Sequence, residues 1–195
     1  MTNPDRALQD IAAIRAQIAA SQLFRGFGPM VVGLSGCLAI VAAFWQSWHP
    51  EVDYFIFWGV LAVLCVAMIG VEMVALSPRH HAHLALPMLR ATLGKFLPVG
   101  CAGASIGAVV YGFAPETAWI LPGLWQILIA IGLFAAAPNL PPLMRLAAVW
   151  YFLTGLATMI AASGGGPLSP WAMGLPFGLG QILVALCLRF QKATP

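Results

Sequence analysis

The sequence predicts an all-α polytopic membrane protein with six transmembrane helices, and three observations support this fold class. First, 61% of the 195 residues are hydrophobic and only 8% are charged, whereas a soluble domain is typically about 45–50% apolar and about 25% charged. Second, the chain contains five long uncharged stretches, at residues 26–50, 54–71, 96–115, 117–144 and 146–188. Third, these stretches lack the alternation of apolar and polar residues that marks a transmembrane β-strand. The composition excludes an ordinary soluble domain, a disordered chain and a disulfide-stapled scaffold.

The uncharged stretches divide into six spans, because a spanning helix needs roughly 20 apolar residues. Residues 138–142, Pro-Asn-Leu-Pro-Pro, cannot continue a helix, and residues 163–167, Ser-Gly-Gly-Gly-Pro, are typical of a hairpin loop. We therefore expect helices at about 27–47, 55–76, 96–114, 118–137, 143–162 and 170–189. They form one transmembrane domain over residues 26–190, between an N-terminal segment 1–25 and a short tail 191–195.

The charged residues orient these spans. In a six-span arrangement all basic residues fall on one side of the membrane: Arg6, Arg15, Arg25, Arg79, Arg90, Lys95, Arg145, Arg189 and Lys192. The opposite side carries Glu51, Asp53 and Glu116. Because basic residues stay on the cytoplasmic side, both termini are predicted to be cytoplasmic and the membrane to be a bacterial inner membrane. Seven aromatic residues near the outer helix ends are interpreted as an interfacial belt, with an aromatic ligand cage as the alternative: Trp45, Trp48, Tyr54, Trp58, Tyr111, Trp119 and Trp171.

Residues 3–25 have the pattern of an amphipathic helix. Asn3 suits the N-cap and Pro4 the first helical position. One apolar stripe recurs at helical spacing, formed by Leu8, Ile11, Ile14 and Ile18. Such a helix can anchor the first span at the membrane surface or dock a partner protein.

The connection between the second and third spans, residues 77–95, is the longest in the chain. It contains His80, His81 and His83, followed by the apolar run 84–89, which predicts a short interfacial helix. These histidines could bind a metal ion or haem. No cysteine or carboxylate lies near them at a zinc-like spacing, so solvated interfacial histidines are the simpler interpretation.

Glu72 is the only charged residue inside a predicted span. An ionisable group at the centre of a membrane costs at least ~2.5–3.5 kcal/mol, so such a residue is a functional candidate. Glu72 lies about one turn from the cytoplasmic end of its helix. It could form a structural ion pair there, or it could carry a proton or contact a ligand.

Two glutamines are predicted near the middle of the membrane, Gln126 in the fourth span and Gln181 in the sixth. Their amides either tie helices together or line a ligand cavity with the aromatics outside the belt, Trp125, Trp150 and Tyr151. Prolines one turn earlier, Pro122 and Pro176, free backbone carbonyl groups. The similar sequences around them suggest that the six spans are three parallel two-helix repeats, with chance similarity as the alternative.

Small residues and cysteines carry no catalytic signature. Gly33-Leu34-Ser35-Gly36 matches the Gly-x-Ser-Gly of the rhomboid intramembrane proteases. No histidine lies within a span to activate the serine, so these residues are interpreted as a helix-packing site. The four cysteines are isolated and no Cys-x-x-Cys occurs, which disfavours thiol–disulfide exchange.

Several motifs resemble a loosely defined family of small uncharacterised six-span bacterial inner-membrane proteins. The resemblance lies in Asp10-Ile11-x-x-Ile14-Arg15, residues 24–29, Val71-Glu72-Met73, Phe96-Leu97-Pro98 and residues 121–126, Leu-Pro-Gly-Leu-Trp-Gln. It implies no established activity. It implies that a small winged-helix regulator is the protein partner.

Together these features predict a non-enzymatic membrane interaction or sensor protein. Its cytoplasmic helices would dock a regulator-like partner or a second copy, and an intramembrane cavity would hold a lipid or small apolar ligand. The partners are thus the bilayer and a protein, with no direct nucleic-acid contact and no cofactor. The alternatives are a small proton-coupled transporter that uses Glu72, and a haem or metal protein that uses the loop histidines.

Overall fold

A computed structural model describes residues 28–80, 85–164 and 168–192, and within this part the chain is helical without a strand. Six helices are long and apolar enough to cross a membrane. Their bounds are α2 (Pro29–Ser47), α3 (Tyr54–His80), α4 (Ala85–Phe113), α5 (Leu121–Ala136), α6 (Met144–Ala162) and α7 (Pro170–Lys192). Short 3-10 helices, η1 (Pro115–Ile120) and η2 (Ala137–Asn139), flank α5. The predicted six-span all-α fold is confirmed, whereas the predicted amphipathic helix lies outside the described residues.

Local chemistry explains where several helices begin. Pro29 and Pro170 are the first residues of α2 and α7, positions where the missing N–H and the fixed φ of proline cost nothing. Asp53 precedes α3, and its Oδ1 accepts a hydrogen bond of 2.8 Å from the N–H of Ile56, the geometry of an N-cap. The connection between α2 and α3 is therefore short and well defined.

Two glycine contacts bring helices together in pairs. The most extensive helix contacts are those of α2 with α7 and of α5 with α6. A Cβ built on Gly36 of α2 would lie 2.6 Å from the carbonyl oxygen of Gly178, and one built on Gly155 of α6 would lie 2.8 Å from that of Gly123. Only glycine permits such an approach, and small residues are the usual means of close helix packing in membranes. The packing role predicted for the Gly-Leu-Ser-Gly motif is consistent with this contact.

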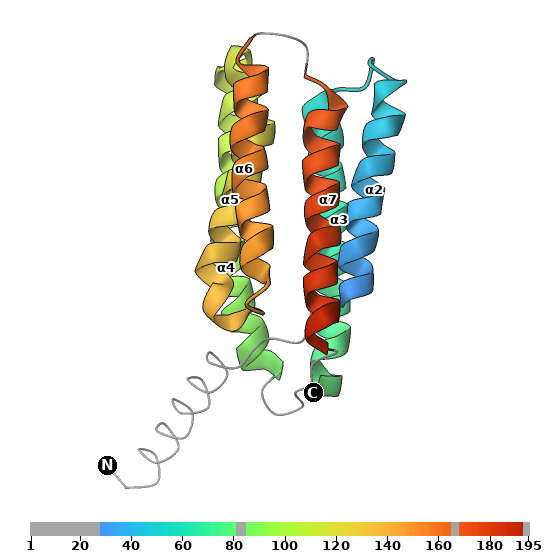
Figure 1. Ribbon diagram of the computed structural model, residues 1–195. Coiled ribbons are helices and arrows are strands. Elements are labelled where there is room, and N and C mark those ends of the chain that lie inside the picture. Colours follow the sequence, from blue (N-terminus) through green and yellow to red (C-terminus); the bar gives the residue numbers. More distant parts are fainter. Residues whose placement is uncertain (1–27, 81–84, 165–167, 193–195) are drawn as a thin grey trace, which may run out of the picture.

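The two pairs stand next to each other, with α3 and α4 as an outer layer (Figure 1). Helix α4 packs on α5, and α3 contacts both α4 and α2. Only 11% of the residues in the spans of α3 and α4 are buried, against 33–44% in the other four spans. The apolar surface of α3 and α4 is thus the part of the bundle with least protein cover.

The connection between the second and third spans differs from the prediction. Residues 85–89 of the apolar run do not form a separate interfacial helix. Instead, α4 is continuous from Ala85 to Phe113 and contains Pro98, while α3 continues to His80. A proline is tolerated within a membrane helix because neighbouring groups can satisfy the carbonyl that it frees. Both helices therefore reach past the rest of the bundle at the end where α2 begins (Figure 1).

Charge separates the two ends of the bundle. We call the end that holds the α2–α3 connection the Asp53 end, where Glu51, Asp53 and Glu116 are exposed. We call the opposite end the Glu72 end, where Arg145 and Arg189 are exposed at the start of α6 and near the end of α7. The acidic residues of the connections and these arginines are thus at opposite ends, as the six-span arrangement requires.

Candidate functional site

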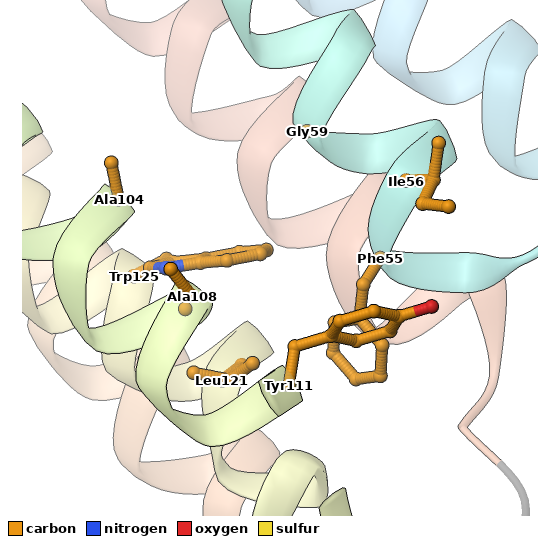
Figure 2. A pocket seen from close by; sticks show the side chains of 9 residues that line it. Phe55, Ile56, Gly59, Ala104, Ala108, Tyr111, Leu121 and Trp125 are labelled. Atoms are coloured by element: carbon orange, nitrogen blue, oxygen red, sulfur yellow. The ribbon is translucent and has the colours of Figure 1, made fainter. Parts of the chain in front are cut away.

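A cavity of about 250 Å³ lies between α3, α4 and α5, towards the Asp53 end. Figure 2 shows the rings of Phe55 and Tyr111 close to each other on one side of this cavity and the indole of Trp125 on another. The lining is apolar apart from the Tyr111 hydroxyl and the Trp125 indole nitrogen, and consists of Phe55, Ile56, Gly59, Ala104, Gly107, Ala108, Tyr111, Leu121 and Trp125. The cavity is a broadly open depression rather than an enclosed space, and its apolar lining suits an apolar guest.

Small residues and a fixed indole create this space. The indole Nε1 of Trp125 donates a hydrogen bond of 3.1 Å to the carbonyl oxygen of Gly103. A Cβ built on Gly107 would lie 3.2 Å from the same ring, so the edge of the indole that carries Nε1 lies against the glycines of α4. On the α3 side, a Cβ built on Gly59 would meet nothing within 4 Å. The cavity exists because large side chains are missing at these positions.

A carboxylate and a phenol mark the rim of the cavity at the Asp53 end. The Tyr111 hydroxyl donates a hydrogen bond of 3.3 Å to Oδ2 of Asp53, and the other carboxylate oxygen caps α3 through the N–H of Ile56. The rings of Phe55 and Tyr111 are 6.1 Å apart in an edge-to-face arrangement. Asp53 itself is exposed. The Asp53 carboxylate is therefore hydrogen-bonded to a side chain that lines the cavity.

Gln126 lies at the junction of α5, α6 and α7 and is fully buried. Its Nε2 donates to the carbonyl oxygens of Pro122 (3.1 Å) and Ala172 (3.2 Å) and lies 3.5 Å from the Thr158 hydroxyl. The carbonyl of Ala172 is the one that Pro176 leaves without a helical donor, because proline has no N–H. The amide of Gln126 thus supplies the hydrogen-bond donor that Pro176 removes from α7. This contact agrees with the interpretation in which the glutamine amides hold helices together.

Other members of the predicted cavity group also bind helices to one another. On α6, the Trp150 indole donates to the Pro176 carbonyl oxygen at 2.9 Å, and the Tyr151 hydroxyl donates to that of Phe177 at 3.2 Å. The Cβ of Gln181 faces Gly36 of α2. The structure thus spreads the five predicted side chains over separate helix contacts, and of these only Trp125 lines the cavity described above.

Glu72 lies near the start of α2. A Cβ built on Gly28 would overlap the Glu72 carboxylate, and Oε2 of this carboxylate is fully buried. The N–H groups of the first turn of a helix have no acceptor within the helix, and an anion placed there is stabilised by about 0.3–1 kcal/mol or more. This placement, at the contact of α2 with α3, favours the structural interpretation of Glu72. Proton coupling through Glu72 stays a prediction.

Two groups of predicted residues lie wholly or partly outside the described part of the chain. The apolar stripe proposed to dock a partner, Leu8, Ile11, Ile14 and Ile18, belongs to residues 1–27. His81 and His83 are also outside, and His80 is described only as the last residue of α3. Among the residues that are described, no cluster of three His, Cys, Asp or Glu could hold a metal ion.

One buried polar pair was not expected from the sequence. Trp58 is 2% exposed, and its indole Nε1 donates a hydrogen bond of 2.7 Å to Oε1 of the buried Gln46. Trp58 was assigned to the interfacial belt, but it instead packs between α2 and α7, where a Cβ built on Gly174 would lie 3.3 Å from its ring. The only signal for this in the sequence was the polar Gln46 within an apolar helix, which needs a partner.

Comparison with known proteins gives no match: no protein-family model fits the chain, and neither a curated protein nor a solved structure is significantly similar to it.

Proposed function

We propose that this protein is a non-enzymatic membrane protein that binds an apolar ligand, or the chain of a lipid, in the cavity between α3, α4 and α5. The observation that carries the proposal is the cavity itself, with its apolar lining and its position within two candidate spans, Tyr54–Glu72 and Phe96–Phe113. A ligand that dissolves in the bilayer would enter it sideways.

The volume of the cavity limits the size of the ligand. A cavity of about 150 Å³ lined by apolar side chains binds benzene, so a volume of about 250 Å³ corresponds to roughly ten carbon atoms at the same packing. This is smaller than the usual pocket for a drug-sized molecule, about 300–1,000 Å³. A single alkyl chain or a small apolar compound fits better than a bulky ring system.

The docking part of the proposal rests on the Glu72 end. There α3 and α4 reach past the other helices (Figure 1), and the sequence places Arg79, Arg90 and Lys95 in this region. We infer that this end faces the cytoplasm of a bacterial cell and that a regulator-like protein or a second copy binds there. The positive-inside rule supports this orientation, because the acidic connections lie at the other end.

A photoreactive probe tests the binding proposal. The purified protein in lipid nanodiscs is incubated with dodecanol carrying a diazirine on its chain, irradiated, digested and mapped by mass spectrometry. We expect labels on the residues that line the cavity. Replacing Gly59 by leucine places a side chain in the cavity without a backbone clash, so Gly59→Leu should reduce this labelling several-fold.

The matched control is Gly70→Leu. Gly70 is also on α3, and a Cβ built there also meets nothing within 4 Å, but it does not line the cavity. This variant should be labelled like the parent protein. Equal labelling of the cavity residues in Gly59→Leu and the parent, or no labelling there at all, would refute ligand binding in this cavity.

A further inference from the structure

We propose that the ligand of the cavity is an amphiphile with one alkyl chain and a positively charged head group, the chain lying in the cavity and the head group at Asp53 and Tyr111. This inference rests on the proposed function and adds the chemical class of the ligand. It is argued from the rim of the cavity, whereas the proposed function is argued from the lining.

The first argument is charge. The carboxylate of Asp53 is held in place from two sides, by the N–H of Ile56 at 2.8 Å and the hydroxyl of Tyr111 at 3.3 Å. Because Tyr111 also lines the cavity, this negative charge lies one side chain away from the space for the chain. The carboxylate is exposed and retains lone pairs for a further partner. A cationic head group would find its counter-charge next to the cavity, beyond the ring of Tyr111.

The second argument is the absence of lysine and arginine from the sequence on this side, where His49 is the only other basic side chain in the stretch around Asp53. No Lys or Arg occurs between Arg25 and Arg79 or between Lys95 and Arg145, the two stretches that contain the Asp53 rim. An anionic head group would therefore meet only like charge, which disfavours fatty acids and alkyl sulfates. The charges near Asp53 therefore favour a cationic head group over an anionic one.

The third argument is the aromatic entrance. The rings of Phe55 and Tyr111, 6.1 Å apart, lie together next to the cavity (Figure 2). Aromatic ring faces attract cations, and quaternary ammonium groups are recognised in this way. A carboxylate and two rings at the mouth of an apolar cavity form a site for an alkylammonium rather than for a neutral alcohol.

The experiment compares three probes with the same photoreactive dodecyl chain and different heads, namely trimethylammonium, hydroxyl and sulfate. Each is added to the protein in nanodiscs of zwitterionic lipid at equal membrane concentration, and labelling of the cavity peptides is quantified. We expect the order ammonium, hydroxyl, sulfate. Each step should be roughly two- to five-fold, the size of one partly exposed charge interaction.

Two charge-removing variants localise the effect. Asp53→Asn keeps an acceptor for Tyr111 and a good N-cap for α3 but removes the charge, so it should abolish the preference for ammonium over hydroxyl. Glu116→Gln removes another exposed acid of the same end, outside the cavity rim, and should keep most of that preference. Equal losses in both variants would show a general surface potential and overturn the Asp53 site.

The outcomes separate the two proposals. If the three probes label the cavity equally well, the head-group inference is wrong and the apolar binding function stands. If none of them labels the cavity, the proposed function fails. If the sulfate probe is preferred, the charge argument is wrong in sign.

Discussion

The hydrogen bond between Gln126 and Ala172 gives the sharpest test of how this bundle is held together. Replacing Gln126 by methionine keeps an unbranched side chain of similar length and removes both amide hydrogens. The Pro122 carbonyl, which accepts one of them at 3.1 Å, still has the N–H of residue 126 within α5. The Ala172 carbonyl, which accepts the other at 3.2 Å, has no helical donor because residue 176 is proline.

The magnitude follows from this difference. Only one acceptor is left without a donor, and hydrogen bonds between membrane helices contribute about 0.6 kcal/mol on average and up to about 1.7 kcal/mol. The Oε1 of Gln126 is buried and has no hydrogen-bond partner among the described residues, so its removal offsets part of the loss. We expect Gln126→Met to lower the free energy of unfolding by about 1 kcal/mol.

A double-mutant cycle isolates the cause. In Pro176→Ala the alanine N–H can bond the Ala172 carbonyl, so the amide of Gln126 is no longer needed there. Gln126→Met should then cost little, which gives a coupling energy of about 1 kcal/mol between the two positions. The assay is reversible unfolding of the four proteins in mixed micelles with increasing dodecyl sulfate, followed by circular dichroism. A coupling energy below about 0.3 kcal/mol, the usual error of additivity, would refute the idea that Gln126 replaces the hydrogen-bond donor missing at Pro176.

Two further predictions use the same assay. Gly28→Ala should lower the free energy of unfolding by about 0.5–1.5 kcal/mol, because its methyl group overlaps the Glu72 carboxylate and forces this side chain out of its rotamer. Gly70→Ala, which meets open space, should cost less, and the penalty at Gly28 should shrink in a Glu72→Ala background. A Gly28→Ala penalty that is unchanged without the carboxylate would contradict this placement of Glu72. Trp58→Phe should cost about 1 kcal/mol, since it leaves the buried Oε1 of Gln46 without the donor seen at 2.7 Å; a Trp58→Phe protein as stable as the parent would show that this bond contributes nothing.

Much of the fold could be predicted because each membrane span can be recognised from its own segment of the sequence. Uncharged runs of about 20 residues define the helices, and prolines at positions 29 and 170 mark the first residues of α2 and α7. The prediction was wrong in separating an interfacial helix from the span at about 96–114. Both belong to α4, which begins at Ala85 and contains Pro98, since a membrane helix can carry a proline that a soluble helix would not tolerate.

The candidate site was less predictable. The sequence grouped Trp125 with Gln126, Gln181, Trp150 and Tyr151, whereas in the structure it lines a different cavity that contains none of those four residues. The other lining residues include glycines and alanines of α3 and α4, such as Gly59 and Ala108, whose contribution is the absence of a side chain. Such a contribution leaves no motif in a Leu-, Ala- and Gly-rich sequence.

The sequence by itself determined that the chain spans a membrane six times and that its acidic connections lie opposite its basic ones. These properties depend on the composition of single segments, and each segment must satisfy its own backbone in lipid. Only the tertiary structure decided that Gln126 donates to the carbonyl that Pro176 leaves without a helical donor. It also decided that Trp58 is buried against Gln46 and that Tyr111 connects Asp53 to an apolar cavity. These contacts join residues from different helices, and helix pairing depends on close packing at glycines and on single hydrogen bonds that no segment specifies alone.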